Sequence, residues 1–500
     1  MIKRIFNTPL KKGFAAVSGA TMVSRILGLV RDIFMAKFFG TSMFADAFYV
    51  AFRIPNLLRR LLGEGALPAA FIPVYSEILV NKEEERAKKL AGSIFSFLFV
   101  ICSVLTAAGF IFAPTIVRLI APGFAGDPEQ FALTVTLARI MIPILLLVTL
   151  STVAMGICNA RKYFFVPAIA PALFNVSAIA FFLFFARGVP GYDIRGIAVF
   201  AVIGFLLHFV VMAPILFREK VTSFYYFIKG VFSNPDVKKI TVLLIPAALG
   251  ISVMQLNIFV DTICATLMGS GIVSALFFAN RLYQLPLALF GVSVSMVSLP
   301  FMSDARAEKK TAKVEKNLFD SFAASLFFII PATAGLIILG KEIVSLLFER
   351  GLFSAGSTAM TSAALVCYSA GLAAFAGIRI FANYFYSKKN MKTPVKIAVI
   401  SFFVNIAGDI AALLLDLGPG GLAAATSIAA VVNFALLAAL VVKDGVKPPP
   451  SFYRKLIIVL TAALVMTGFL LAPLHIHTLI KIALGSGIYF ASARLLKPLF

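Results

Sequence analysis

The chain has 500 residues, of which 61% are hydrophobic and 13% are charged, and this composition excludes an ordinary soluble domain. Its formal net charge is +23, but the basic residues gather in short stretches between long apolar segments. That distribution is typical of membrane topology rather than of a nucleic-acid-binding surface. Most apolar segments reach the roughly 20 residues that a helix needs to cross the hydrocarbon core, and the alternating segments of about 10 residues typical of a β-barrel are absent.

The apolar segments predict an all-α polytopic membrane protein with fourteen transmembrane helices. The expected ranges are 14–39, 43–79, 90–121, 129–159, 165–187, 195–217, 238–269, 271–302, 315–348, 357–386, 393–416, 420–442, 454–473 and 477–497. Connections rich in Lys and Arg alternate with short connections rich in Gly and Pro. By the positive-inside rule, this alternation predicts that both termini are cytoplasmic.

The chain also repeats a pattern of residues in its two halves. Pro73 near the end of the second span matches Pro300 near the end of the eighth, and 300 − 73 = 227. Pro167 and Pro394 open the fifth and eleventh spans at the same offset, since 394 − 167 = 227. Six spans separate the copies, so the halves share one orientation, as in transporters built from parallel repeats. The predicted parts are an N-terminal lobe at 1–230, a C-terminal lobe at 231–445 and an added helix pair at 446–500.

The first two predicted spans carry an unusual number of charges. A charge near the bilayer centre costs about 3 kcal/mol or more, so such residues usually face a protein interior or a water-filled cavity. Arg25 and Asp32 are seven residues apart and therefore share nearly one face of a helix. The same spacing relates Arg53 to both Asp46 and Arg60. These spans therefore predict the wall of a wet, cationic cavity.

The surplus of positive charge in this wall predicts an anionic substrate. Arg281 in the eighth span extends the surplus into the second half of the chain. The planar guanidinium group suits phosphate or diphosphate oxygens. We expect Asp32, Asp46 and Glu64 to pair with arginines when the substrate is absent. The alternative is that arginines and acids only neutralise one another in pairs that hold helices together.

A second group of polar residues lies in the C-terminal half. Asp261 is in the middle of the seventh span, Asn405 and Asp409 share a face of the eleventh, and Thr426 follows in the twelfth. Carboxylate, amide and hydroxyl oxygens are the hard ligands that a small cation prefers, and they also suit a proton relay. The alternative is a hydrogen-bonded cluster that joins helices.

The sequence motifs of known enzyme classes are incomplete in this chain. The run at 335–342 mimics a phosphate-binding loop, but Glu342 stands where the Ser or Thr is required. No Ser/His/Asp or Cys/His arrangement shares a face, and the connections are too short for an ATPase or a catalytic domain. We therefore expect a transporter driven by an ion gradient, the membrane potential or the substrate gradient. A membrane glycosyltransferase is the alternative from the enzyme class.

Two motifs in the first spans resemble a known family. The runs SRILGLVRD at 24–32 and FADAFYVAFRIPNLLRRLLGEGALPAAFIPVYSE at 44–77, with APGF and KTPVKIA further along, are similar to the MurJ/MviN lipid II flippases of bacteria. The resemblance covers essentially the whole chain. It implies the fold of the multidrug/oligosaccharidyl-lipid/polysaccharide (MOP) exporters, with two six-helix lobes around a cavity and two extra helices that hold the lipid tail.

The resemblance also implies a function in the bacterial inner membrane. Members move the undecaprenyl-diphosphate-linked peptidoglycan precursor, lipid II, to the outer leaflet by alternating access, without covalent chemistry. The expected partners are lipid II, membrane lipids and proteins of cell-wall synthesis, with no nucleic acid. An O-antigen lipid flippase or a cation-coupled multidrug exporter of the same fold is the alternative.

Site residues follow from the resemblance by matching motif. By matching motif, the expected substrate-binding residues are Arg25, Arg31, Arg59 and Arg281. The charged cluster of the first spans adds Arg53 and Arg60 to the expected set. Gating or ion pairing is expected of the acids Asp32, Asp46 and Glu64. The polar group of the C-terminal half resembles a sodium site of some members, with Asp261, Asn405, Asp409 and Thr426 as ligands. Asn280 and Gln284 stand where some members carry acids, so Arg281 is expected to have less local neutralisation.

Overall fold

A computed structural model describes residues 9–59, 67–186, 193–219, 234–473 and 476–496. The described residues form helices and connections and contain no strand, which confirms the predicted all-α membrane fold. Each of the fourteen predicted ranges contains helix. Within the described residues, nine helices are long and apolar enough to cross a membrane, or ten if the bent pair α18 and α19 is one span. The number fourteen stays a prediction.

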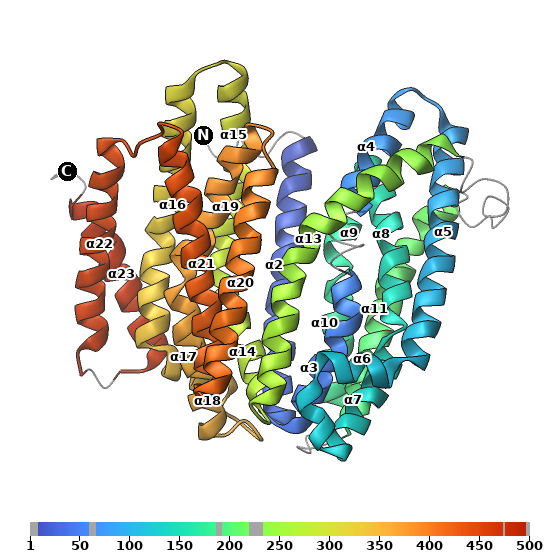
Figure 1. Ribbon diagram of the computed structural model, residues 1–500, viewed down its shortest axis with the longest axis horizontal. Coiled ribbons are helices and arrows are strands. Elements are labelled where there is room, and N and C mark those ends of the chain that lie inside the picture. Colours follow the sequence, from blue (N-terminus) through green and yellow to red (C-terminus); the bar gives the residue numbers. More distant parts are fainter. Residues whose placement is uncertain (1–8, 60–66, 187–192, 220–233, 474–475, 497–500) are drawn as a thin grey trace. The chain divides into compact units, whose positions relative to one another are not determined.

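The chain divides into two compact units, Met1–Phe259 and Val260–Phe500, and Figure 1 shows their helices in sequence colours. The division lies within α13 (Pro235–Leu267). The predicted organisation into lobes at 1–230 and 231–445 with a separate pair stays a prediction. The other helices of the first unit are α2 (Pro9–Phe39), α3 (Met43–Leu58), α4 (Leu67–Val80), α5 (Glu84–Ile111), α6 (Ala113–Ile120), η2 (Pro122–Gly126), α7 (Pro128–Met141), α8 (Ile144–Ala160), α9 (Phe165–Ile169), α10 (Ala172–Ala180), η3 (Phe181–Phe185) and α11 (Ile194–Arg218).

The second unit begins with the end of α13 and continues to the C-terminal helices. Its members are α14 (Ile272–Pro286), η4 (Leu287–Val292), α15 (Ser293–Ala307), α16 (Thr311–Ile338), α17 (Gly340–Phe348), α18 (Ala355–Ala370), α19 (Leu372–Ser387), α20 (Lys392–Leu414), α21 (Gly418–Lys443), α22 (Pro450–Leu471) and α23 (Thr478–Leu496). The last two helices pack against each other and α22 packs on α16. Tyr489 of α23 donates a hydrogen bond to the Phe327 carbonyl of α16 at 2.6 Å.

Helices of the first unit pack through apolar and aromatic side chains. α4, α5, α8 and α11 enclose one apolar core, in which the rings of Phe71 and Tyr75 stack at 5.0 Å. A second aromatic group joins α3, α10 and α11, because Phe174 stacks on Phe52 at 5.5 Å and on Phe205 at 4.9 Å. This group fixes α10 beside the charged helices and so positions the residues that α10 presents to α2.

Matching helix ends support the predicted repeat. Four lysines, all just past helix C-termini, have left-handed backbone conformations, with φ of 59° at Lys82, 67° at Lys162, 55° at Lys309 and 58° at Lys389. Their offsets are 309 − 82 = 227 and 389 − 162 = 227. Each end has the pair of backbone hydrogen bonds of a Schellman motif, as in Lys82 N–H to Leu79 C=O at 3.1 Å. A lysine at this position also interacts favourably with the negative end of the helix dipole.

The first unit joins the C-terminal ends of α8 and α11 by an ion pair. Arg161 directly follows α8, and its Nη2 lies 2.6 Å from Oε2 of Glu219, which directly follows α11. The same nitrogen contacts Glu84 of α5 at 2.6 Å, and the Tyr75 hydroxyl donates to Glu219 at 3.4 Å. We call this group of four residues the first-unit clamp.

The second unit has a matching pair, which we call the second-unit clamp. Lys388 directly follows α19 and lies 2.5 Å from Asp444, which directly follows α21. The Tyr384 hydroxyl donates to Asp444 at 3.2 Å. The basic residues are related by the repeat offset, since 388 − 161 = 227, and the acids nearly so, since 444 − 219 = 225. Each unit therefore ties its own helix ends together on the side predicted to be cytoplasmic.

Candidate functional site

Arg31 on α2 lies in a polar site between α2 and α10. Its Nε and Nη2 donate to Oδ1 of Asp32 at 3.0 and 2.6 Å, and its Nη1 donates to Oδ1 of Asn175 at 3.0 Å. The Phe174 ring lies under the guanidinium at 4.8 Å, a cation–π distance. Asn175 is itself oriented by a 3.0 Å hydrogen bond from Nδ2 to the Ser24 carbonyl of α2. The Asp32 side chain is fully buried, whereas the Arg31 side chain is 13% exposed.

This geometry leaves Arg31 able to bind an anion. A guanidinium group has five N–H donors, and the three contacts to Asp32 and Asn175 use three of them. The buried carboxylate offsets part of the charge of Arg31 and holds its plane in one orientation. A planar guanidinium held in this way suits an incoming phosphate oxygen. The shared face of Arg25 and Asp32 stays a prediction, and the structure shows an ion pair of Asp32 with the adjacent Arg31.

The other predicted charges of α2 and α3 have different environments. Arg25 is exposed on α2, and Asp46 is fully buried in the first turn of α3. Arg53 donates from Nη1 to the Ile258 carbonyl of α13 at 3.1 Å. Arg59 donates from Nε to Oδ1 of Asn56 at 2.8 Å, one turn earlier.

The α3 helix has an open polar side near its C-terminal end. Arg53, Asn56 and Arg59 are half-buried, whereas residues 45–51 of the same helix are buried. The predicted site residues Arg60 and Glu64 lie outside the described residues.

Arg281 lies on α14 in the second unit. The first eight residues of α14 are buried apart from the half-buried Phe277, and the open side of the helix then carries Asn280, Arg281 and Gln284. The Gln284 amide donates to the Asn280 side-chain oxygen. The π-helix η4 follows α14 directly, and such turns inside longer helices occur frequently at functional sites.

The structure brings together three of the four polar residues singled out in the C-terminal half. The Asn405 amide donates to Oδ1 of Asp261 and to Oδ2 of Asp409, both at 2.8 Å. Asn405 is 1% exposed and Asp409 is fully buried. The Thr426 hydroxyl instead donates to the Leu422 carbonyl of its own helix at 3.1 Å, and no hydrogen bond joins it to the group.

Two buried oxygens of this group are without a hydrogen bond in the described part of the chain. Within the described residues, Oδ1 of Asn405 and Oδ1 of Asp409 have no hydrogen-bond partner. Buried polar atoms are normally paired, so orphaned oxygens next to two carboxylates fit a small hard cation. The described residues contain no group of three or more His, Cys, Asp or Glu side chains that could hold a metal ion. The donor set is therefore one of oxygen atoms, with an amide beside two carboxylates.

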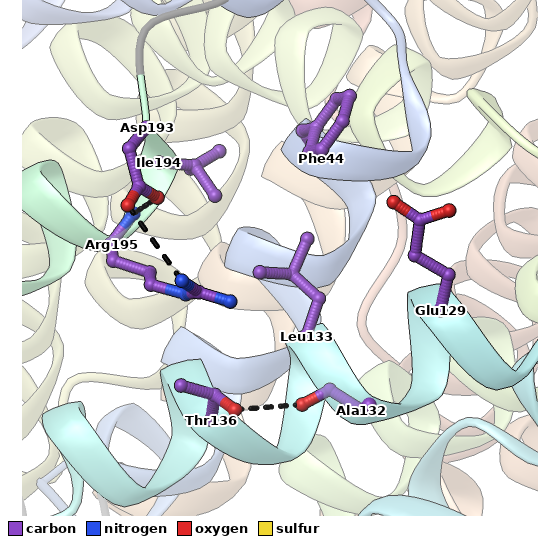
Figure 2. A pocket seen from close by; sticks show the side chains of 8 residues that line it. All are labelled: Phe44, Glu129, Ala132, Leu133, Thr136, Asp193, Ile194 and Arg195. Carbon is purple, nitrogen blue, oxygen red and sulfur yellow. Dashed lines mark hydrogen bonds and ion pairs between the residues drawn. The ribbon is translucent and has the colours of Figure 1, made fainter.

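A separate cavity of about 300 Å³ lies in the first unit where α3, α7 and α11 begin (Figure 2). Phe44, Leu133 and Ile194 form its apolar wall, and Glu129 and Arg195 are at its rim. Figure 2 shows the Arg195 side chain beside Asp193, from which it is separated by 3.9 Å. None of the predicted site residues lines this cavity.

The sequence analysis did not single out two polar residues that the structure brings to attention, Asn175 and Arg379. Asn175, which orients Arg31, is one of several small polar residues in its span, and nothing in its spacing distinguishes it from the others. Arg379 on α19 is an exposed arginine in an apolar span, in the run Ile378-Arg379-Ile380. The rule that singled out Arg281, a charge within a predicted span, also applies to Arg379.

The sequence and the fold match one family. A family profile described as "Lipid II flippase MurJ" matches residues 35–492. A "Probable lipid II flippase MurJ" of Buchnera aphidicola subsp. Acyrthosiphon pisum is 35% identical over 469 residues, which is 93% of this chain and 90% of the relative. A solved structure of "Lipid II flippase MurJ, inward closed conformation" is similar with a TM-score of 0.82 and 30% identity, over 96% of this chain and 98% of that one. An inward-facing multidrug-resistance MATE transporter of the MOP superfamily shares the fold at a TM-score of 0.66 and 15% identity, over 86% and 98% of the two chains.

Proposed function

The chain belongs to the MurJ family of lipid II flippases, and we propose that the arginines of its membrane-spanning helices bind the diphosphate of lipid II during transport. The protein is a multi-pass protein of the bacterial inner membrane, and its function is to flip lipid II. Translocation requires a polar route for the headgroup, while the polyprenyl tail remains in lipid. In our proposal, no covalent bond of the substrate is made or broken.

The single observation that carries the diphosphate site is the setting of Arg31. Its guanidinium is fixed by Asp32, Asn175 and Phe174, and two of its N–H donors remain for an anionic oxygen. Arg53 and Arg59 lie on the half-buried side of α3 and supply further positive charge. Arg25 and Arg60 complete the proposed set in the first unit, and Arg281 extends it to the second. In this proposal, Asp32, Asp46 and Glu64 are the carboxylates that pair with arginines when the headgroup leaves.

We propose Na⁺ as the ion of the acidic group in the second unit. Asp261, Asn405 and Asp409 would hold it, and Thr426 would need to turn its hydroxyl away from Leu422 to join them. The ion would supply positive charge that removes the repulsion between the two buried carboxylates. In this proposal, the α13 helix connects the ion site to an arginine of the diphosphate site. Asp261 lies on α13 three residues after Ile258, and the Ile258 carbonyl accepts a hydrogen bond from Arg53.

Alternating access requires that helices of one unit move together. The first-unit clamp and the second-unit clamp each connect helices of their own unit, which supports motion of each unit as a body. We propose that the clamps face the cytoplasm together with both termini, because they lie among the basic connections. With the cytoplasm negative, return of an unloaded cationic site inward would be favoured by about 2.3 kcal/mol per charge per 100 mV.

Binding of the purified, full-length protein to lipid II tests the proposal. Wild type should bind lipid II more tightly than undecaprenyl phosphate or phosphatidylglycerol, and Arg31→Ala should lose that preference while keeping its folded state. In proteoliposomes, Arg31→Ala and Arg59→Ala should also abolish flipping. Equal binding to all three lipids would mean that the arginines attract anionic lipids in general, and it would contradict the proposed diphosphate site.

A further inference from the structure

The α19 helix is enclosed by the rest of the second unit. Of its 16 residues, only Arg379 and Tyr386 are exposed. A helix that faces lipid instead exposes a stripe of large apolar residues, as α20 does with Val399, Phe403 and Leu414. The open side of α19 is therefore polar, and lipid is not its natural surrounding.

The backbone of α19 is fixed at Arg379. Ser295 of α15 donates to the Arg379 carbonyl at 3.3 Å. One turn later, the buried Asn383 amide donates to the Ser295 carbonyl at 2.7 Å and to the Ser298 hydroxyl at 2.9 Å. These contacts bind α19 to α15 and leave the Arg379 side chain on the open side.

Positive charge on that side chain is not compensated within the unit. Throughout the described ranges, no side chain or carbonyl forms a hydrogen bond or ion pair with the Arg379 guanidinium. Ser387, the last residue of α19, is eight residues further on, or about 12 Å along the helix axis. Arg379 is therefore well inside the span, where an arginine faces water or an anionic partner.

An aromatic contact joins α19 to the helix that carries Arg281. The Tyr283 ring of α14 stacks on Phe375 of α19 at 5.7 Å, and Phe375 lies one turn before Arg379. Arg281 lies only two residues before Tyr283. Both arginines therefore belong to second-unit helices whose open sides are polar, and the rings of Tyr283 and Phe375 connect these two helices.

We propose that Arg379 binds a phosphate oxygen of the lipid II diphosphate, as a second arginine of the second unit in addition to Arg281. This inference rests on the proposed function and adds a residue that the motifs of the first spans do not include. A phosphate is the fitting ligand because the guanidinium has all five donors available and its rigid plane matches two phosphate oxygens.

Substitution of Arg379 tests this role directly. Arg379→Gln removes the charge, Arg379→Lys keeps it without the planar fork, and Lys396→Gln is a matched control that removes an exposed charge at the start of α20. Binding of each full-length protein in nanodiscs is measured with lipid II and with undecaprenyl-diphosphate-linked disaccharide without its peptide. Arg379→Gln should bind both lipids at least about tenfold more weakly, which equals about 1.4 kcal/mol, and Lys396→Gln should bind like wild type. Arg379→Lys should lie between the two.

The outcomes separate this inference from the proposed function. Wild-type affinity of Arg379→Gln, together with lost binding of Arg31→Ala, would overturn the role of Arg379 and leave the diphosphate site intact. If both variants keep full affinity, both proposals fail. If Arg379→Gln loses affinity only for the lipid with its peptide, a peptide carboxylate is the ligand and the phosphate assignment is overturned. If Arg379→Gln does not fold, wild-type affinity of a folded Arg379→Lys would contradict the need for a bidentate guanidinium.

Discussion

Replacement of Arg161 by Met should destabilise the protein far more than the same change at Lys388. Both residues hold a carboxylate at the end of the sixth helix of their repeat, but the burial of the two pairs differs. The Glu219 side chain is 4% exposed and Arg161 is 23% exposed, whereas Asp444 and Lys388 are 38% and 29% exposed. A buried carboxylate cannot recover its lost partner by hydration, and an exposed one can.

The expected magnitudes follow from this burial. In Arg161→Met, the hydrogen bond left to the Glu219 carboxylate among the described residues is the one from the Tyr75 hydroxyl at 3.4 Å. Loss of one partner from a buried pair costs about 3–5 kcal/mol, and the partial exposure of Arg161 places our expectation near about 3 kcal/mol. In Lys388→Met, the lost pair is exposed and its contribution is about 0.2–1 kcal/mol.

Thermal unfolding of the purified, full-length variants in one detergent measures the difference. The apparent melting temperature should fall strongly for Arg161→Met and slightly for Lys388→Met. A double variant, Arg161→Met with Glu219→Gln, removes the uncompensated charge and should recover most of the loss. Equal effects of the two single variants, or no recovery in the double variant, would refute the reasoning from burial.

Three further predictions concern the cation group, the support of Arg31 and the second-unit clamp. Wild type should melt at a higher temperature in NaCl than in KCl, and Asp409→Asn should abolish this difference because it removes a buried charged oxygen of the proposed Na⁺ site. Gly204→Ala should weaken lipid II binding, because its Cβ would lie 2.7 Å from the α10 backbone that positions the partners of Arg31, whereas Gly468→Ala has nothing within 4 Å and should bind normally. The hydrogen bond from Lys388 holds the pKa of Asp444 below its ordinary value of about 4, so this pair stabilises the folded state above that pH and its contribution is lost as the pH falls below it. Asp444→Asn should therefore reduce the difference in melting temperature between pH 7 and pH 3.

Each of these has an outcome that contradicts it. A sodium-specific stabilisation that survives in Asp409→Asn would move the ion elsewhere. Normal lipid II binding by a folded Gly204→Ala protein would show that the position of α10 does not matter to Arg31. An unchanged pH dependence in Asp444→Asn would assign the acid sensitivity to other carboxylates.

The amino-acid sequence determined the class of this protein and most of its local structure. Helix length and hydropathy are properties of contiguous residues, so all fourteen predicted ranges contain helix. The repeat was also readable, because matched prolines at an offset of 227 coincide with matched left-handed lysines at the same offset. Arg31 and Asp409 could be named as candidate site residues without a structure, because they are charges within apolar runs. The cost of burying a charge in a membrane does not depend on the fold.

Only the tertiary structure decided which of these side chains meet. Helical spacing placed Asp32 with Arg25, yet its carboxylate contacts Arg31, which reaches Asn175 at a distance of 144 residues along the chain. Such pairings depend on how neighbouring helices cross and rotate, and periodicity within one helix carries no information about that. The same holds for the open side of α19, because a helix is known to be enclosed only when its neighbours are in place. The charge of Arg379 could be read from the sequence, but its place on the open side of an enclosed helix could not.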